Sequence, residues 1–127
     1  MSRGTYYLDM QDVLVLHRRQ IERFGGAPGV RDAGLIEAAL ARSQSGYYAD
    51  LVEEAAALWE SLTTNRGFVD GNKRVGFAAT QVFLRINGLD ITATAGETLH
   101  FVIGSLEAGA FEKVRLESWL RANTAAA

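Results

Sequence analysis

The residues best suited to chemistry are crowded into positions 65–74, which read Asn-Arg-Gly-Phe-Val-Asp-Gly-Asn-Lys-Arg. Gly71 permits a tight turn with positive φ. The main-chain N–H groups of Asn72, Lys73 and Arg74 would then open a helix with no acceptor inside it. Because the helix dipole adds about half a positive charge at this end, the pattern predicts an anion-binding site.

Charged and polar side chains surround this predicted turn. Lys73 and Arg74 stand where a helix otherwise disfavours cations, which makes sense if a phosphate lies between them. Asp70 offers a hard oxygen ligand that suits Mg²⁺ held jointly with nucleotide oxygens, and the Asn72 amide can donate to a phosphate. A purely structural alternative stays open, in which Asp70 caps the helix, Gly71 makes the turn and the two cations are solvated.

The same stretch resembles the signature of the Fic/Doc family: histidine, any residue, phenylalanine, any residue, Asp or Glu, a small residue, asparagine, Gly or Lys, and arginine. Arg66 stands at the histidine position, and the other six positions match: Phe68, Asp70, Gly71, Asn72, Lys73 and Arg74. Residues 25–32 and 34–37 are also similar to the Doc branch, and the resemblance covers essentially the whole chain. Lys73, where AMP-transferring Fic proteins usually have glycine, and Phe77, where they have a further arginine, both favour Doc.

This resemblance implies an activity, cofactors and partners. Doc toxins phosphorylate a threonine of translation elongation factor Tu from ATP and so halt protein synthesis. Asp70 would hold Mg²⁺, while Gly71, Asn72, Lys73 and Arg74 would hold the phosphates of ATP. Phe68 would anchor the loop in the core. The expected partner is a Phd-like antitoxin whose C-terminal segment folds as a helix into a groove.

Arg66 is the departure that matters for activity. The family's histidine is the general base that takes the proton of the attacking hydroxyl, which requires a pKa near the working pH. A guanidinium has a pKa above ~12 and no lone pair to offer. We therefore expect the loss of the ~10² to 10⁴-fold that general-base catalysis supplies, with nucleotide binding retained. His17 and His100 are expected to be packed or surface residues and not substitutes.

Two other functions remain open at this point. The chain can be a transferase of AMP or another nucleotide monophosphate, as Fic relatives are. It can also be a non-catalytic module that binds an antitoxin, and for that partner Tyr47 and Tyr48, in a predicted loop, are better anchors than the two tryptophans at core spacing.

The elements that must position the loop are predicted to be helices. Apolar residues recur at spacings of three and four within residues 10–24, 33–43, 50–64, 72–86, 94–108 and 111–122. Helix 72–86 is apolar almost all round, which predicts a central place. Residues 89–93 alternate and predict an extended piece or a short strand, whereas residues 124–127 are expected to fray. The prediction is an all-α fold in a single Doc-like domain, 1–127.

Composition restricts the remaining possibilities. A chain of 127 residues with 48% hydrophobic and 22% charged residues suits one soluble globular domain. A net charge of -2 supplies no basic surface for nucleic acid, and the absence of cysteine excludes disulfides and thiolate chemistry. No apolar run approaches the ~20 residues of a membrane span, and no signal peptide is evident, so we expect a cytoplasmic protein.

Overall fold

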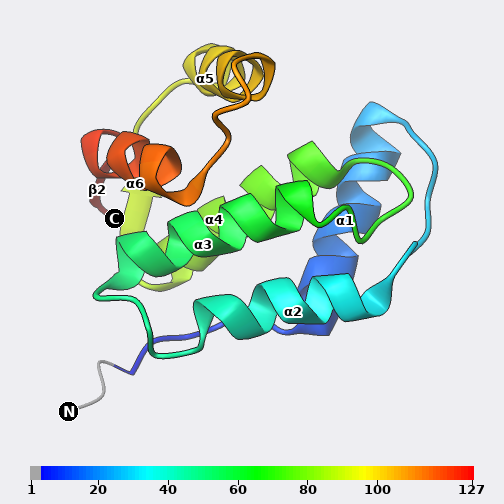
Figure 1. Cartoon of the computed structure of the whole chain (residues 1–127), viewed down its shortest axis with the longest axis horizontal. Coiled ribbons are helices and arrows are strands. Elements are labelled where there is room, and N and C mark those ends of the chain that lie inside the picture. The colour runs from blue at the N-terminus through cyan, green and yellow to red at the C-terminus, as the bar shows by residue number, and fades with distance from the viewer. Residues whose placement is uncertain (1–3) are drawn as a thin grey trace.

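The computed structural model describes residues 4–127, and within them six helices and one small sheet (Figure 1). The elements in chain order are α1 (Met10–Phe24), α2 (Ala33–Ser43), α3 (Leu51–Thr64), α4 (Asn72–Ile86), β1 (Leu89–Ile91), α5 (Ala95–Glu107), α6 (Lys113–Ala122) and β2 (Thr124–Ala126). The predicted all-α fold with about six helices is confirmed. Every helix begins and ends within two residues of its predicted bounds.

Side-chain caps explain why four of the helices begin where they do. The carboxylates of Asp9, Asp32 and Asp50 each accept a hydrogen bond from the main-chain N–H three residues further on. Thr94 does the same at the start of α5, where Glu97 completes a capping box. In contrast, α4 has no side-chain cap, which leaves its first turn available to another acceptor.

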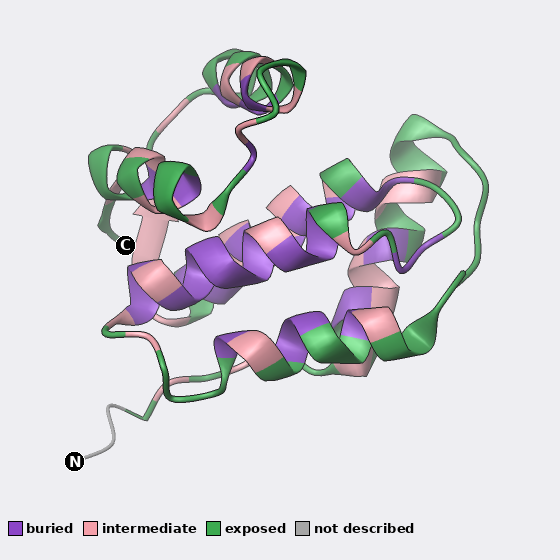
Figure 2. Cartoon of the chain, viewed as in Figure 1, coloured by how far each residue is buried: buried purple, intermediate pink, exposed green. Residues whose placement is uncertain are grey.

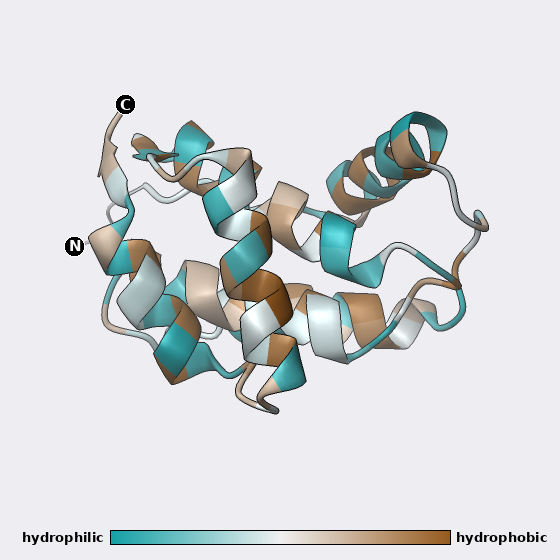
Figure 3. Ribbon diagram, turned by 90° about the horizontal axis from the view of Figure 1, so that it is seen from above, coloured by the Kyte–Doolittle hydropathy of each residue, from teal (hydrophilic) through white to brown (hydrophobic). Residues whose placement is uncertain are grey.

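The core lies where α3 and α4 pack side by side, with α2 and α6 against α3 and α1 against α4 (Figures 1 and 2). Trp59 of α3 is fully buried, and α3 is the more completely buried of the two central helices. They approach closely because Gly76 has no Cβ, which would collide with Thr63 Oγ1. Hydrophobic and hydrophilic residues alternate along the ribbons of Figure 3, as amphipathic helices require.

The C-terminal tail corrects one prediction. Residues 124–127 were expected to fray, yet β2 pairs with β1 in antiparallel register, Asp90 opposite Ala125. The Ala127 N–H also donates to the Gly88 carbonyl at 2.9 Å. These bonds use main-chain atoms alone, so a tail of small residues carries no sequence signal for them. The alternating residues at 89–93 do contain the predicted short strand, β1.

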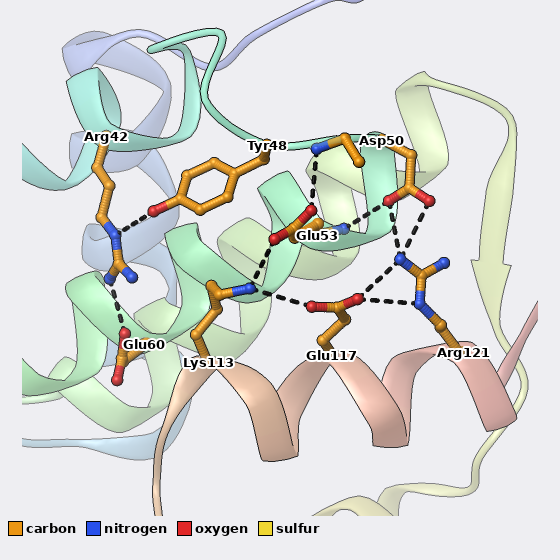
Figure 4. A network of polar contacts seen from close by, with 9 residues as sticks. Arg42, Tyr48, Asp50, Glu53, Glu60, Lys113, Glu117 and Arg121 are labelled. Carbon is orange, nitrogen blue, oxygen red and sulfur yellow. Dashed lines mark hydrogen bonds and ion pairs between the residues drawn. The ribbon is translucent and has the colours of Figure 1, made fainter.

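Ion pairs fasten α6 to the N-terminal end of α3 (Figure 4). Lys113 Nζ lies 2.8 Å from Glu53 Oε2 and 3.1 Å from Glu117 Oε1. Arg121 Nη2 lies 2.8 Å from Glu117 and 3.0 Å from Asp50. This network is at the opposite end of α3 from the 65–74 loop, so α6 supports the scaffold and not the site.

None of the helices in residues 4–127 has the length and hydrophobicity to span a membrane.

Candidate functional site

The 65–74 loop joins α3 to α4 and forms one wall of a cleft of about 760 Å³, a volume typical of small-molecule sites. Leu106 of α5 also lines this cleft. Six of the seven candidate residues line it: Arg66, Asp70, Gly71, Asn72, Lys73 and Arg74. The seventh, Phe68, is 1% exposed and points into the core, as expected for an anchor.

Gly71 begins α4 in the conformation that the sequence predicts. Its φ of 75° and ψ of 17° lie in the left-handed region, where a side chain is disfavoured. A Cβ at this position would also lie 3.2 Å from Ile21 Cδ1 and 3.5 Å from His17 Nε2. Both the turn and the close approach of α1 therefore require glycine here.

The first turn of α4 presents unpaired donors. The earliest hydrogen bond of this helix runs from the Val75 N–H to the Gly71 carbonyl at 2.9 Å. Within residues 4–127, no acceptor receives the main-chain N–H of Asn72, Lys73 or Arg74. Because this turn lines the cleft, the geometry is that of an anion-binding helix start.

The Asn72 side chain has a role that the sequence did not predict. Its Nδ2 donates to the Phe68 carbonyl at 3.0 Å, and its Oδ1 accepts the Phe68 N–H at 3.0 Å. The side chain is buried, and it closes the loop on itself. The phosphate contact expected of this amide stays a prediction, for which the second Nδ2 hydrogen and the main-chain N–H are the available donors.

Asp70 turns both carboxylate oxygens toward main-chain donors. Oδ1 accepts the Gly71 N–H at 2.8 Å, and Oδ2 accepts the Ala27 N–H at 3.2 Å. The bonds from Ala27 and Gly71 hold the pKa of this carboxyl below its ordinary value, with a smaller contribution from the charge of Arg74. Asp70 is therefore ionised at neutral pH, and among the described residues that line the cleft it alone is acidic.

Three cations line the cleft together with this one carboxylate: Arg66, Lys73 and Arg74. Arg66 is exposed and has a φ of 55°, the one non-glycine residue with positive φ among the described residues. The Arg74 guanidinium carbon lies 5.8 Å from the centre of the Phe24 ring. The cleft therefore carries an excess of positive charge, which suits a polyanionic ligand.

The two histidines are placed as expected, but one has a role that was missed. His17 is buried, and its Nε2 donates to the Asp70 carbonyl at 2.7 Å, so it supports the loop from behind. His100 is exposed on α5 and does not line the cleft. Arg31 was also missed, since its side chain binds the main chain of the 65–74 loop from the segment before α2.

Comparisons with known proteins agree with this geometry. Residues 7–84 match the sequence model of the Fic/DOC family, a span that includes α1 to most of α4 and the whole 65–74 loop. The chain is 46% identical over 94 residues to "Toxin Doc" of Mycolicibacterium smegmatis, covering 70% of this chain and 70% of the relative. It is 32% identical over 89 residues to "Protein kinase doc" of Escherichia phage P1, covering 67% of this chain and 71% of the relative.

Proposed function

The chain belongs to the Fic/Doc family, and on that premise we propose that it is a Doc-type toxin whose cleft binds ATP with Mg²⁺ and whose phosphotransferase chemistry is disabled by Arg66. One observation carries the proposal. The unpaired main-chain N–H groups of the first turn of α4 line the same cleft as Lys73 and Arg74. Donors and positive charge are thus gathered where the phosphates of a nucleotide would lie.

The donor set also fits Mg²⁺. This ion binds proteins through one or two carboxylates and completes its shell with water and phosphate oxygens. The ionised Asp70 supplies one carboxylate beside the first turn of α4, and its oxygens keep lone pairs beyond those used by Ala27 and Gly71. When bound, Mg²⁺ would neutralise phosphate charge, while Asp70 fixes its place.

Transfer of the γ-phosphoryl group to a hydroxyl requires a base for the hydroxyl proton, and position 66 is where the family keeps it. Arg66 cannot accept a proton. His17 does not replace it, because its ring is buried behind the loop and Nε2 is committed to the Asp70 carbonyl. We therefore propose a chain that binds ATP and transfers little or nothing, with elongation factor Tu as the acceptor once a base is restored.

Labelled ATP tests this function directly in the Arg66→His protein. Incubation with elongation factor Tu should label the factor from γ-labelled ATP, at a rate ~10² to 10⁴ times that of the unchanged chain. Label from α-labelled ATP would instead select the transfer of AMP. An Arg19→His variant, changed on the exposed face of α1, controls for the mere addition of a histidine. No label from either nucleotide would reject a transferase.

Antitoxin binding is the second candidate, and an exposed apolar stripe on α5 favours it. Leu99 and Ile103 are 60% and 43% exposed and lie one turn apart, and the next turn carries Leu106, which lines the cleft. This spacing suits the apolar face of a partner helix. Of the predicted anchors, Tyr47 is 84% exposed, whereas the Tyr48 hydroxyl is bound by Arg42.

A peptide titration tests the apolar stripe on α5. We expect Leu99→Glu combined with Ile103→Glu to weaken binding of the antitoxin's C-terminal peptide by about 10-fold or more, because hot-spot residues each contribute over about 1 kcal/mol. Val114→Glu on α6 is the matched control, since Val114 is 73% exposed outside the stripe. Equal affinities for all variants would exclude α5 as the docking site.

A further inference from the structure

The main chain at positions 65–67 is fixed by residues that precede α2. The Arg31 and Asp32 N–H groups both donate to the Gly67 carbonyl, at 2.8 and 2.9 Å. An isolated antiparallel bridge pairs Val30 with Phe68. In Figure 1 the light-blue segment between α1 and α2 accordingly runs beside the green loop between α3 and α4.

The Arg31 side chain adds contacts of another kind. Its Nε donates to the Arg66 carbonyl at 2.7 Å, and its Nη2 donates to the Asn65 carbonyl at 3.2 Å. These carbonyls follow the last turn of α3, where the helix leaves acceptors unpaired and where its dipole favours a cation. Bonds from a charged donor are about twice as strong as neutral ones.

Position 66 needs such support because its main chain is strained. A φ of 55° lies in the left-handed region, which disfavours any residue with a Cβ. The Arg31 bond acts on the carbonyl of this very residue, and the bond to Asn65 fixes the residue before it. Both bonds therefore act on the main chain next to the side chain at position 66, which lines the cleft.

Gly67 holds the main chain of the 65–74 loop against α2. A Cβ at Gly67 would collide with Ile36 Cγ1 of α2, so the main chain lies directly on that helix. The loop is thus fixed at Gly67 by packing and at Asn65 and Arg66 by the Arg31 guanidinium. Of these supports, the Arg31 side chain is the one that can be removed without disturbing the core, because Arg31 is exposed.

We propose that Arg31 is a positioning residue for the reacting group at position 66: its guanidinium holds the Asn65 and Arg66 carbonyls so that the side chain at position 66 points into the cleft. The inference rests on the proposed function, because it takes position 66 as the place of the general base. Arg31 itself is not among the residues that line the cleft.

The kinetic test compares variants in the Arg66→His background. Adding Arg31→Ala should lower kcat for transfer from γ-labelled ATP by about 10²-fold, the cost of misplacing a reacting group by about 1 Å. The KM for ATP should change by less than about two-fold, since the phosphate donors belong to α4. Arg31→Lys should recover part of kcat, because an ammonium can reach one carbonyl. Arg19→Ala is the control, an exposed arginine of α1 that should leave both constants unchanged.

A second measurement does not need activity. In the chain with Arg66 retained, ¹⁵N relaxation of the residue 66 and 67 amides should show lower order parameters after Arg31→Ala, and no change after Arg19→Ala. If the Arg66→His protein transfers nothing, the proposed function is rejected. The order parameters of the residue 66 and 67 amides then still test whether Arg31 fixes the loop. An unchanged kcat, a raised KM with kcat intact, or unchanged order parameters at residues 66 and 67 would each overturn the inference.

Discussion

The rings of His17 and Phe68 stack nearly parallel, with their centres 3.8 Å apart and their planes 11° apart. His17 belongs to α1 and Phe68 to the 65–74 loop, so the stack joins the first helix to the loop that shapes the cleft. The same imidazole donates through Nε2 to the Asp70 carbonyl at 2.7 Å. One side chain thus supports the loop on both sides of Val69.

We expect His17→Ala to destabilise the protein by about 2–4 kcal/mol, because it removes a buried ring and leaves the Asp70 carbonyl without its donor. His100→Ala is the matched control: His100 is exposed on α5, so its loss should change stability by less than about 0.5 kcal/mol. Urea denaturation followed by circular dichroism measures both. Equal midpoints for the two variants would show that the stack contributes nothing.

Two glycines with nearly equal φ allow the cost of the left-handed main-chain conformation to be measured apart from the cost of steric crowding. Gly71 has a φ of +75° with Ile21 and His17 close to its missing side chain, whereas Gly46 has a φ of +79° and nothing within 4 Å. Gly46→Ala should cost about 0.5–1 kcal/mol, because the left-handed conformation costs alanine about 1–2 kcal/mol and the lower freedom of its unfolded chain returns about 0.5–1 kcal/mol. Gly71→Ala should cost more, because the Ile21 contact at 3.2 Å must also shift. Thermal denaturation compares them, and a smaller loss for Gly71→Ala would contradict the crowding.

Acid should weaken the loop through Asp70. Its pKa in the folded protein lies below the ordinary value of 3.8, because Ala27 and Gly71 donate hydrogen bonds to the carboxylate. The folded state therefore binds this proton less readily than the unfolded state. The stabilisation is complete above the ordinary pKa and is lost as the pH falls through the lowered folded value.

Removing the carboxylate tests this pH dependence. Below the ordinary pKa of Asp70, the stability of the Asp70→Asn protein should fall less steeply with decreasing pH than that of the unchanged protein. Urea midpoints at a series of pH values measure this. Glu37→Gln, an exposed substitution on α2, measures the general effect of losing one acidic side chain. Curves of identical shape for the unchanged protein and the Asp70→Asn protein would contradict a lowered pKa for Asp70.

Much of the fold can be predicted from the sequence because the responsible interactions are local. Asp9 and Thr94 cap helices through bonds that span three residues, and Gly71 permits the positive φ of the turn that opens α4. Such features need only neighbouring residues in the chain. The candidate site can be located for the same reason, since seven of the residues that line the cleft lie within the single 65–74 stretch.

The supports of that site depend on contacts that no local spacing encodes. The Arg31 guanidinium reaches the carbonyl of Arg66 from 35 positions away, and His17 reaches that of Asp70 from 53. Their acceptors are main-chain oxygens, which every residue has. The sequence therefore cannot indicate which residue accepts the hydrogen bond from Arg31 or from His17. The place of Leu106 in the lining of the cleft is likewise set by how α5 packs, and the helical periodicity of α5 alone cannot reveal it.

Arg66→Gly should make the protein more stable. At a φ of 55°, an arginine carries a penalty of about 1–2 kcal/mol that glycine avoids, while glycine loses about 0.5–1 kcal/mol through the greater freedom of its unfolded chain. The net gain is about 0.5–1 kcal/mol, or a rise in Tm of about 2–4 °C. Loss of one of three cations around the cleft should add to this gain at low salt, because like charges repel.

Lys73→Gly is the control for that gain, because it also removes a cation beside the cleft but places glycine within the first turn of α4. Helical glycine costs about 1 kcal/mol, so Lys73→Gly should lower the Tm where Arg66→Gly raises it. Differential scanning calorimetry at low and high salt measures both. A lower Tm for Arg66→Gly would mean that the Arg66 side chain forms stabilising contacts that outweigh its backbone strain.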